Sequence, residues 1–77
     1  MITVRYFAAA AEAAGCETEP VPAGTGAAVR ADLEARHPGL SAILDRCAVL
    51  ADGQPLTADG VVAAGATLDV LPPFAGG

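Results

Sequence analysis

Two consecutive prolines follow the last apolar segment of the chain and restrict how that segment can pair. Thr67–Leu71 alternates its side chains as a β-strand does, and Pro72 and Pro73 come directly after it. Proline fixes φ and has no amide donor, so a strand that reaches Pro72 must leave the sheet there. The sequence therefore predicts a folded domain over residues 1–71 whose last strand ends at Leu71.

The segment after the prolines ends in two glycines. Gly76 and Gly77 have no Cβ, so this backbone can pass through a narrow channel and take conformations that other residues avoid. In extended form, residues 72–77 span about 20 Å. We expect residues 72–77 to be a flexible tail that carries its carboxyl into a partner protein. An ordinary frayed end is the alternative.

The first segment, Ile2–Phe7, alternates on a β-branched and aromatic background and predicts a half-buried strand. Its even-numbered residues would face the core, which leaves Phe7 pointing outward. Leu71 points away from the core in the last strand in the same way. We therefore predict a docking patch made by Phe7 and Leu71 with Phe74 beyond them, because exposed apolar patches mark partner sites.

Between these two strands the chain carries helix and turn signals. Thr25 can cap a helix over Gly26–His37, which Pro38 and Gly39 end. The remaining elements are shorter: a helix over Ala8–Ala14 closed by Gly15, an edge strand within Cys16–Val21, a turn over residues 23–26, a helical turn over residues 40–44 and a hairpin over residues 47–56 that turns at Asp52-Gly53.

This order of elements defines the expected fold class. Strand, short helix, strand, longer helix, hairpin and last strand leave no room for a second helical layer. The simplest arrangement is an α+β fold of the ubiquitin-like β-grasp type, a mixed sheet with one main helix packed on one face. In such a fold the first and last strands lie parallel at the centre of the sheet.

The charge of the chain limits its partners. The net charge is −5, and all four basic residues apart from the single histidine are arginines. Such a surface repels nucleic acid and anionic membranes, so we expect neither as a partner and expect a protein with basic groups instead. Because the chain has no lysine, it also cannot accept an isopeptide bond on a side chain.

Cys16, Cys47 and His37 carry the remaining candidate chemistry. The cysteines lack CxxC spacing and no histidines cluster, which argues against a metal site or a redox motif; a disulfide between them stays open. The absence of a convincing secretory segment favours a reducing, cytoplasmic location. His37 is explained by the favourable dipole at the end of its predicted helix rather than by a role as general base.

Four motifs occur in order along the chain: Tyr6-Phe7-Ala8 with Glu12 and Gly15, then His37-Pro38-Gly39-Leu40, then Asp52-Gly53, then Leu71-Pro72-Pro73 with Gly76-Gly77. Together they resemble the small sulfur-carrier proteins of the MoaD/ThiS family, most closely its molybdopterin synthase small subunits. Two positions depart from the family pattern. Gly65 is followed by Ala66-Thr67 where an acidic pair is common, and Phe74 is bulkier than the usual valine.

The resemblance implies a chemistry for the tail. Gly77 would be adenylated with ATP by a ubiquitin-activating-type adenylyltransferase, and a sulfurtransferase would convert it to a thiocarboxylate. In the large subunit of molybdopterin synthase, that group would donate sulfur for dithiolene formation in molybdenum cofactor biosynthesis. The reacting end would be Gly77 and Gly76, and the residues that bind the partner would be Phe7, Leu71, Pro72, Pro73, Phe74 and Ala75.

On the same interpretation the chain binds no metal and no cofactor of its own. It would not be catalytic alone, because the acids, bases and cations of the reaction would belong to the large subunit. Three other functions remain open: a sulfur carrier for thiamin thiazole synthesis or another sulfur-transfer pathway, a ubiquitin-like modifier attached to lysines of other proteins, and a β-grasp interaction module with an idle tail.

Overall fold

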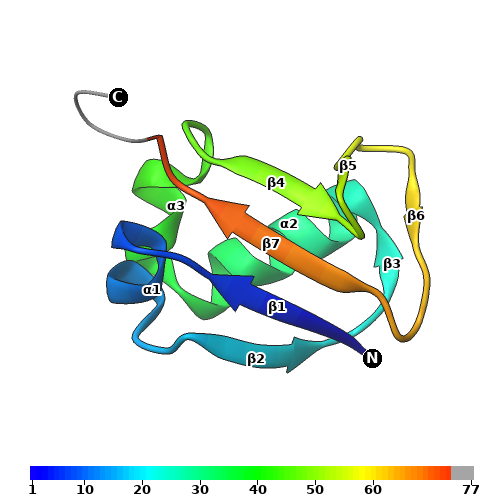
Figure 1. Ribbon diagram of the computed structural model, residues 1–77, viewed down its shortest axis with the longest axis horizontal. Coiled ribbons are helices and arrows are strands. Elements are labelled where there is room, and N and C mark those ends of the chain that lie inside the picture. Colours follow the sequence, from blue (N-terminus) through cyan, green and yellow to red (C-terminus); the bar gives the residue numbers. More distant parts are fainter. Residues whose placement is uncertain (74–77) are drawn as a thin grey trace.

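The computed structural model describes residues 1–73 and builds them around a five-stranded mixed sheet (Figure 1). The strands of this sheet are β1 at Ile2–Tyr6, β2 at Thr18–Val21, β4 at Ala48–Ala51, β5 at Gln54–Pro55 and β7 at Thr67–Leu71. They lie side by side in the order β2-β1-β7-β4-β5. The two strands that contain proline, β2 and β5, form the edges, as predicted for strands that cannot complete a ladder.

The first and last strands of the sheet, β1 and β7, lie parallel at its centre, while its other pairs are antiparallel. Thr3 is in register with Thr67, and Tyr6 with Val70. Alternate residues are buried along both strands, so one face of the sheet meets the core and the other faces outward. The predicted β-grasp arrangement is confirmed.

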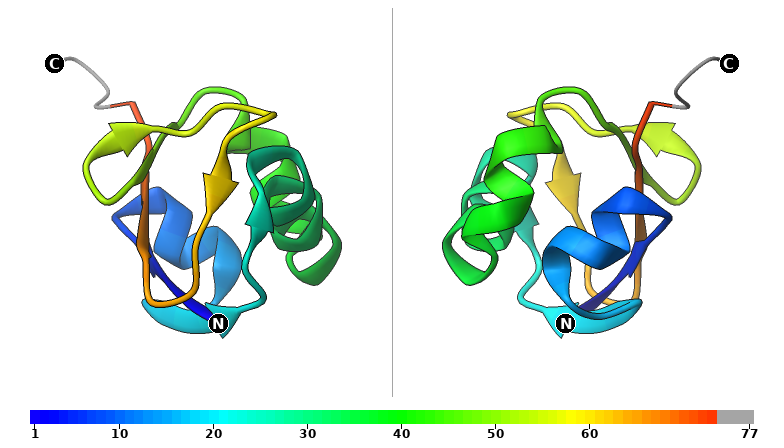
Figure 2. Two further views of the ribbon diagram at one scale, coloured as in Figure 1. Left: turned by 90° about the vertical axis from the view of Figure 1, so that its right-hand side faces the viewer. Right: turned by 90° about the vertical axis from the view of Figure 1, so that its left-hand side faces the viewer.

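Within residues 1–73, three helices cover the inner face of the sheet (Figure 2): α1 at Ala9–Ala14, α2 at Gly26–Arg36 and α3 at Pro38–Leu44. Gly15 takes a left-handed φ of 76° and ends α1, as predicted. Thr25 Oγ1 accepts a hydrogen bond from the Ala28 amide at 3.2 Å and caps α2, again as predicted. Pro38 both stops α2 and begins α3, where no amide donor is needed. None of these helices has the length and apolar character required to cross a membrane.

The core lies between the sheet and the helices. Each layer contributes apolar side chains that solvent does not reach, and the removal of this surface from water is the main force that holds a domain of this size together. The buried residues are Ile2, Val4, Tyr6, Val21, Val62, Leu68 and Val70 from strands, with Ala10, Val29, Leu33, Leu40 and Leu44 from helices.

One part of the fold differs from the sequence expectation. The sequence predicts a turn over residues 23–26, but Gly24–Thr25 forms strand β3, which pairs antiparallel with β6 at Val61–Val62 in a second, two-stranded sheet. Gly26 follows directly, and a Cβ at this position would lie 1.9 Å from the carbonyl oxygen of Thr57. The segment that leads to β6 therefore closes tightly over the start of α2, and only glycine fits beneath it.

The hairpin between β4 and β5 turns where the sequence predicts. Asp52 and Gly53 have φ values of 47° and 82°, the pair of left-handed residues that a two-residue hairpin turn favours. Asp52 also ties the hairpin to the start of β7, because its amide donates to the Thr67 carbonyl at 2.8 Å and its Oδ1 accepts from the Thr67 amide at 2.9 Å.

Candidate functional site

The end of β7 is the point where the predicted functional segment leaves the fold. Leu71 is the last residue of β7, as the two prolines predict. Pro72 is buried and Pro73 is exposed, so the backbone stays against the domain for one residue beyond the strand. The other predicted tail residues lie outside the described part of the chain: Phe74, Ala75, Gly76 and Gly77.

An apolar surface flanks this exit on the outer face of the sheet. We call it the outer patch and define it as Phe7, Leu50 and Leu71. Phe7 is 38% exposed and Leu71 is half-buried. Phe7 directly follows β1, and its amide donates to the carbonyl of Val70 in β7 at 3.2 Å, so it lies next to Leu71. The predicted pairing of Phe7 and Leu71 on the outward face is therefore present.

Leu50 is a member of the outer patch that sequence reasoning misses. Its neighbours Val49 and Ala51 pack against the core, so Leu50 between them faces outward. It lies opposite Asp69 in the pairing of β4 with β7. The alternation of side chains within residues 48–51 could have indicated that Leu50 faces outward. Its position beside β7, however, depends on the order of the strands in the sheet, which the local sequence does not determine.

An ion pair crosses the centre of the outer face beside this patch. Arg5 donates to both carboxylate oxygens of Asp69, from Nε at 2.6 Å and from the terminal nitrogen at 2.9 Å. These hydrogen bonds hold the pKa of Asp69 below its usual value, and the same contact raises the pKa of Arg5. The Arg5 guanidinium carbon also lies 5.7 Å from the centre of the Phe7 ring, within cation–π range.

The backbone at Ala8 bends sharply between Phe7 and α1. Its φ of 50° with ψ of −124° is a conformation that a residue with a Cβ rarely adopts. Conformations of this kind cost about 1–3 kcal/mol and persist where the surrounding structure enforces them. Here the hydrogen bond of Phe7 to β7 and the start of α1 on either side fix the bend, which holds the Phe7 ring on the outer face.

A polar cluster lies on the core side of the sheet, where Tyr6 and β2 meet the end of α2. Glu19 Oε2 accepts a hydrogen bond from the Tyr6 hydroxyl at 2.5 Å and contacts His37 Nε2 at 2.5 Å, while an Arg36 nitrogen lies 3.6 Å from Oε1. Burial raises the pKa of Glu19, but the hydrogen bonds from Tyr6 and His37 outweigh it and leave the pKa below its usual value. Burial, and then the hydrogen bond to Glu19, raises the pKa of Tyr6.

The structure gives His37 a partner that its sequence neighbourhood does not reveal. As predicted it closes α2, with its amide donating to the Leu33 carbonyl at 3.0 Å. Its ring, however, is bonded to Glu19 and packs edge-to-face on Tyr6, with 5.8 Å between ring centres. These partners are remote in sequence, so no spacing rule could have found them.

The two cysteines do not pair. Cys16 and Cys47 are both free thiols and both are half-buried. The Cys47 thiol donates to the Ile43 carbonyl at 3.3 Å, and burial raises the pKa of each cysteine. The disulfide that the sequence left open is therefore absent between these two residues.

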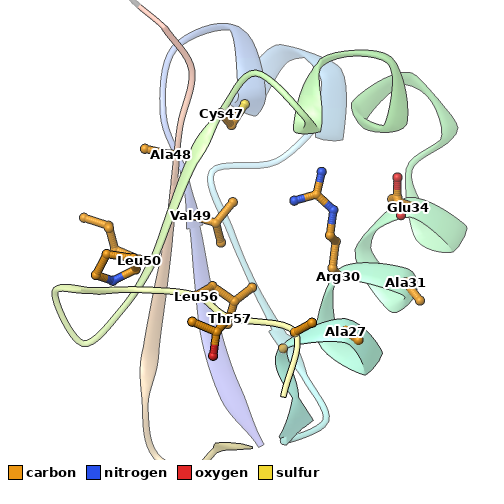
Figure 3. Close-up of a pocket in the computed structure, with 13 residues that line it drawn as sticks. Ala27, Arg30, Ala31, Glu34, Cys47, Ala48, Val49, Leu50, Leu56 and Thr57 are labelled. Atoms are coloured by element: carbon orange, nitrogen blue, oxygen red, sulfur yellow. The ribbon is translucent and has the colours of Figure 1, made fainter. Parts of the chain in front are cut away.

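A groove of about 540 Å³ separates α2 from the β4–β5 hairpin (Figure 3). Arg30 extends from α2 into this space toward Val49, and the wall is otherwise mostly apolar. Its two charged residues already have partners, since Arg30 pairs with Asp45 and Glu34 accepts a hydrogen bond from Ser41 at 3.3 Å. Among the residues that the structure describes, the groove brings together no converging set of reactive side chains.

The fold defines a class of protein: a ubiquitin-like β-grasp domain whose central last strand ends beside an apolar surface patch. The model of the ThiS family matches residues 4–77, nearly the whole sequence. The chain therefore belongs to the ThiS family, the MoaD/ThiS sulfur carriers. Comparison with curated proteins gives no significant match.

Solved structures give the same class. The chain is similar to SAMP1 from Haloferax volcanii, with 33% identity, a TM-score of 0.81 and coverage of 99% of this chain and 98% of that one. A second structure, of small archaeal modifier protein 1 from H. volcanii, is 32% identical with a TM-score of 0.76, covering 95% and 97%. A protein from Pyrococcus furiosus, proposed to be subunit 1 of a molybdopterin converting factor, is 21% identical with a TM-score of 0.82, covering 95% and 97%. The last similarity is one of fold.

Proposed function

We propose that this protein is a sulfur carrier that delivers sulfur as a thiocarboxylate on Gly77. The path of β7 carries the proposal: the strand is paired on both sides at the centre of the sheet, and it leads into Pro72 and Pro73 beside the outer patch. A strand held from both sides is among the last elements to open, so the segment after it starts from a fixed point. Membership of the ThiS family supports the same chemistry.

The chemistry begins with activation, because a carboxylate is a poor electrophile. A separate ubiquitin-activating-type adenylyltransferase joins the Gly77 carboxylate to the AMP part of ATP and releases pyrophosphate. A persulfide on a sulfurtransferase then attacks the acyl-adenylate and displaces AMP, and a thiol reductant cleaves the resulting acyl disulfide to leave the thiocarboxylate. Gly76 and Gly77 present no side chain to either active site, so the partner can enclose the reacting carbon closely.

The sulfur acceptor that we propose is the cyclic pyranopterin precursor of molybdopterin, in a complex with the large subunit of molybdopterin synthase. The support comes from the residues that surround the exit. Phe7 of the Tyr6-Phe7-Ala8 motif lies beside Leu71, at the end of the Leu71-Pro72-Pro73 motif. The two motifs that resemble the molybdopterin synthase branch are thus adjacent in space, where a large subunit would contact both.

A second candidate function is that of a ubiquitin-like protein modifier. It is favoured by the similarity to small archaeal modifier protein 1, which is 32% identical over nearly the full length of both chains. The same activated Gly77 could react with a lysine of another protein and form an isopeptide bond. Because this chain has no lysine, such conjugates would not extend into lysine-linked chains of the protein itself.

Intact mass spectrometry of the protein from its native host tests the carrier function directly. We expect a species about 16 Da heavier than the unmodified chain, because one oxygen of the terminal carboxyl is replaced by sulfur. Single-turnover transfer from that species to the cyclic pyranopterin, with the large subunit present, would identify the acceptor. Isopeptide-linked conjugates without any thiocarboxylate would contradict the carrier function and favour the modifier function.

A further inference from the structure

Three side chains of metal-ligating types converge where the start of β2 meets the end of α2. Cys16, Glu19 and His37 each offer a ligand atom, and these sulfur, oxygen and nitrogen atoms all lie within 4.8 Å of one another. They come from the loop after α1, from β2 and from the junction of α2 with α3. His37 lies far from Cys16 and Glu19 in the sequence, so only the fold brings the three together.

We propose that Cys16, Glu19 and His37 form a binding site for one zinc-type divalent cation. The ligand set, one sulfur, one imidazole nitrogen and one carboxylate oxygen, is of the kind that Zn²⁺ prefers. Three protein ligands leave the fourth tetrahedral position open for water or an external ligand. The site is independent of the chemistry proposed for Gly77.

The distances among the three ligand atoms suit this cation after a small adjustment. Metal–ligand bonds of about 2.0–2.3 Å place neighbouring ligand atoms of a tetrahedral site roughly 3.3–3.8 Å apart. The Glu19 to His37 contact, 2.5 Å, would have to open by about 1 Å, and the thiol of Cys16 lies within the 4.8 Å limit of both. Side-chain rotation on a half-buried surface can supply movements of this size.

The surroundings keep the site accessible and hold its ligands. The side chains of Glu19 and His37 are 15% and 17% exposed, so solvent and a small cation can reach them. The Tyr6 hydroxyl bonds to Glu19 Oε2 and would orient the coordinating carboxylate, as outer partners of metal ligands do. Arg36 lies 3.6 Å from the other oxygen, Oε1, which leaves Oε2 facing His37 and the cation.

Titration of the full reduced chain with Co²⁺, followed by optical absorption, tests this site. Co²⁺ takes the place of Zn²⁺ and, when bound to a thiolate, gives a charge-transfer band together with visible bands typical of tetrahedral coordination. We expect one Co²⁺ per chain, with both band types, and displacement by Zn²⁺. The variant Cys16→Ser should lose the charge-transfer band and bind at least about tenfold more weakly.

Cys47 provides the matched control, since it is also a half-buried free thiol but lies apart from the cluster. Cys47→Ser should keep the band and the affinity. Glu19→Gln, a nearly isosteric change, should also weaken binding, so the test does not depend on one variant that folds poorly. Zn²⁺ should raise the melting temperature of wild type and Cys47→Ser by more than that of Cys16→Ser or Glu19→Gln. Absence of the charge-transfer band in wild type, its survival in Cys16→Ser, or its loss in Cys47→Ser would overturn the proposal.

Discussion

Arg5 and Asp69 lie directly opposite each other on the two parallel central strands, and both oxygens of the Asp69 carboxylate accept hydrogen bonds from the Arg5 guanidinium. The pair joins the first and last strands on the outer face, where the alternating pattern places polar residues. Because Arg5 also contacts the Phe7 ring, the pair helps to fix the outer patch. The ion pair therefore links the stability of the central strands to the geometry of the exit.

The Asp69 pair should make stability depend on acidic pH. The pKa of Asp69 is lowered in the folded state by its hydrogen bonds to Arg5, so the pair contributes stability that is present above the unfolded pKa, about 3.9. This contribution is lost as the pH falls through the lower, folded pKa. Thermal melting of wild type and Asp69→Asn should show wild type a few degrees more stable at pH 7, with the difference shrinking below about pH 4. A difference that stays constant down to pH 2 would contradict this assignment.

Gly26 should be nearly intolerant of substitution, although alanine normally favours a helix. A Cβ here would lie 1.9 Å from the Thr57 carbonyl oxygen and 3.1 Å from Leu56 Cδ1, so the segment above α2 would have to move. We expect Gly26→Ala to lower the free energy of unfolding by about 3 kcal/mol or more. Gly24→Ala is the control, because its Cβ would meet Ala28 at 3.7 Å, an ordinary contact. Urea unfolding gives the free energy of unfolding of each variant. Equal values for Gly26→Ala and Gly24→Ala would contradict the close contact between Gly26 and Thr57.

The local sequence pattern predicts the sheet and the point where the tail leaves it. It does not predict the small β3–β6 sheet. Alternation within Ile2–Phe7 and Thr67–Leu71, together with two prolines, predicts the central strands, their inner faces and the end of β7. Strands β3 and β6 have two residues each, which is too short to show an alternating pattern of apolar and polar residues. Their pairing also depends on the close approach of Gly26 to Thr57, two residues that are remote in sequence. Sequence alone gives no reason to expect it.

The polar cluster shows the same limit more sharply. Glu19 appears in the sequence as one acidic residue of an edge strand, and His37 as the end of a helix. Their contact arises because β2 and the end of α2 pack at one edge, which is a consequence of tertiary structure. A site formed by residues remote in sequence can be recognised only once the fold is known. A continuous segment such as the tail can be recognised from its sequence alone.

The outer patch should contribute to partner binding more than to stability. Phe7 is 38% exposed, so Phe7→Ala should change the free energy of unfolding by no more than about 1 kcal/mol. If a large subunit covers the patch, the same change should weaken binding by roughly 10- to 100-fold, in the range of an aromatic hot spot. Val61→Ala is the matched control, because Val61 is an exposed apolar residue of the small sheet and lies outside the patch. The measurement is calorimetric titration of each variant with the large subunit. If both variants lost the same affinity, or if Phe7→Ala lost none, the outer patch would not be part of the interface.

The tail should determine activity without determining stability. Removal of Gly76 and Gly77 takes away no side chain, so a chain that ends at Ala75 should fold and melt like the full chain. Its carboxyl would be two residues short and would carry a Cβ, so ATP-dependent adenylation should fall by about 100-fold or more. A chain with one residue added after Gly77 should fail as well, because the carboxyl of Gly77 becomes an amide. The measurement is pyrophosphate release by the activating enzyme, followed by single-turnover sulfur transfer. If either altered tail transferred sulfur at the full rate, Gly77 would not be the sulfur-bearing residue, and the β-grasp domain would act through its surface instead.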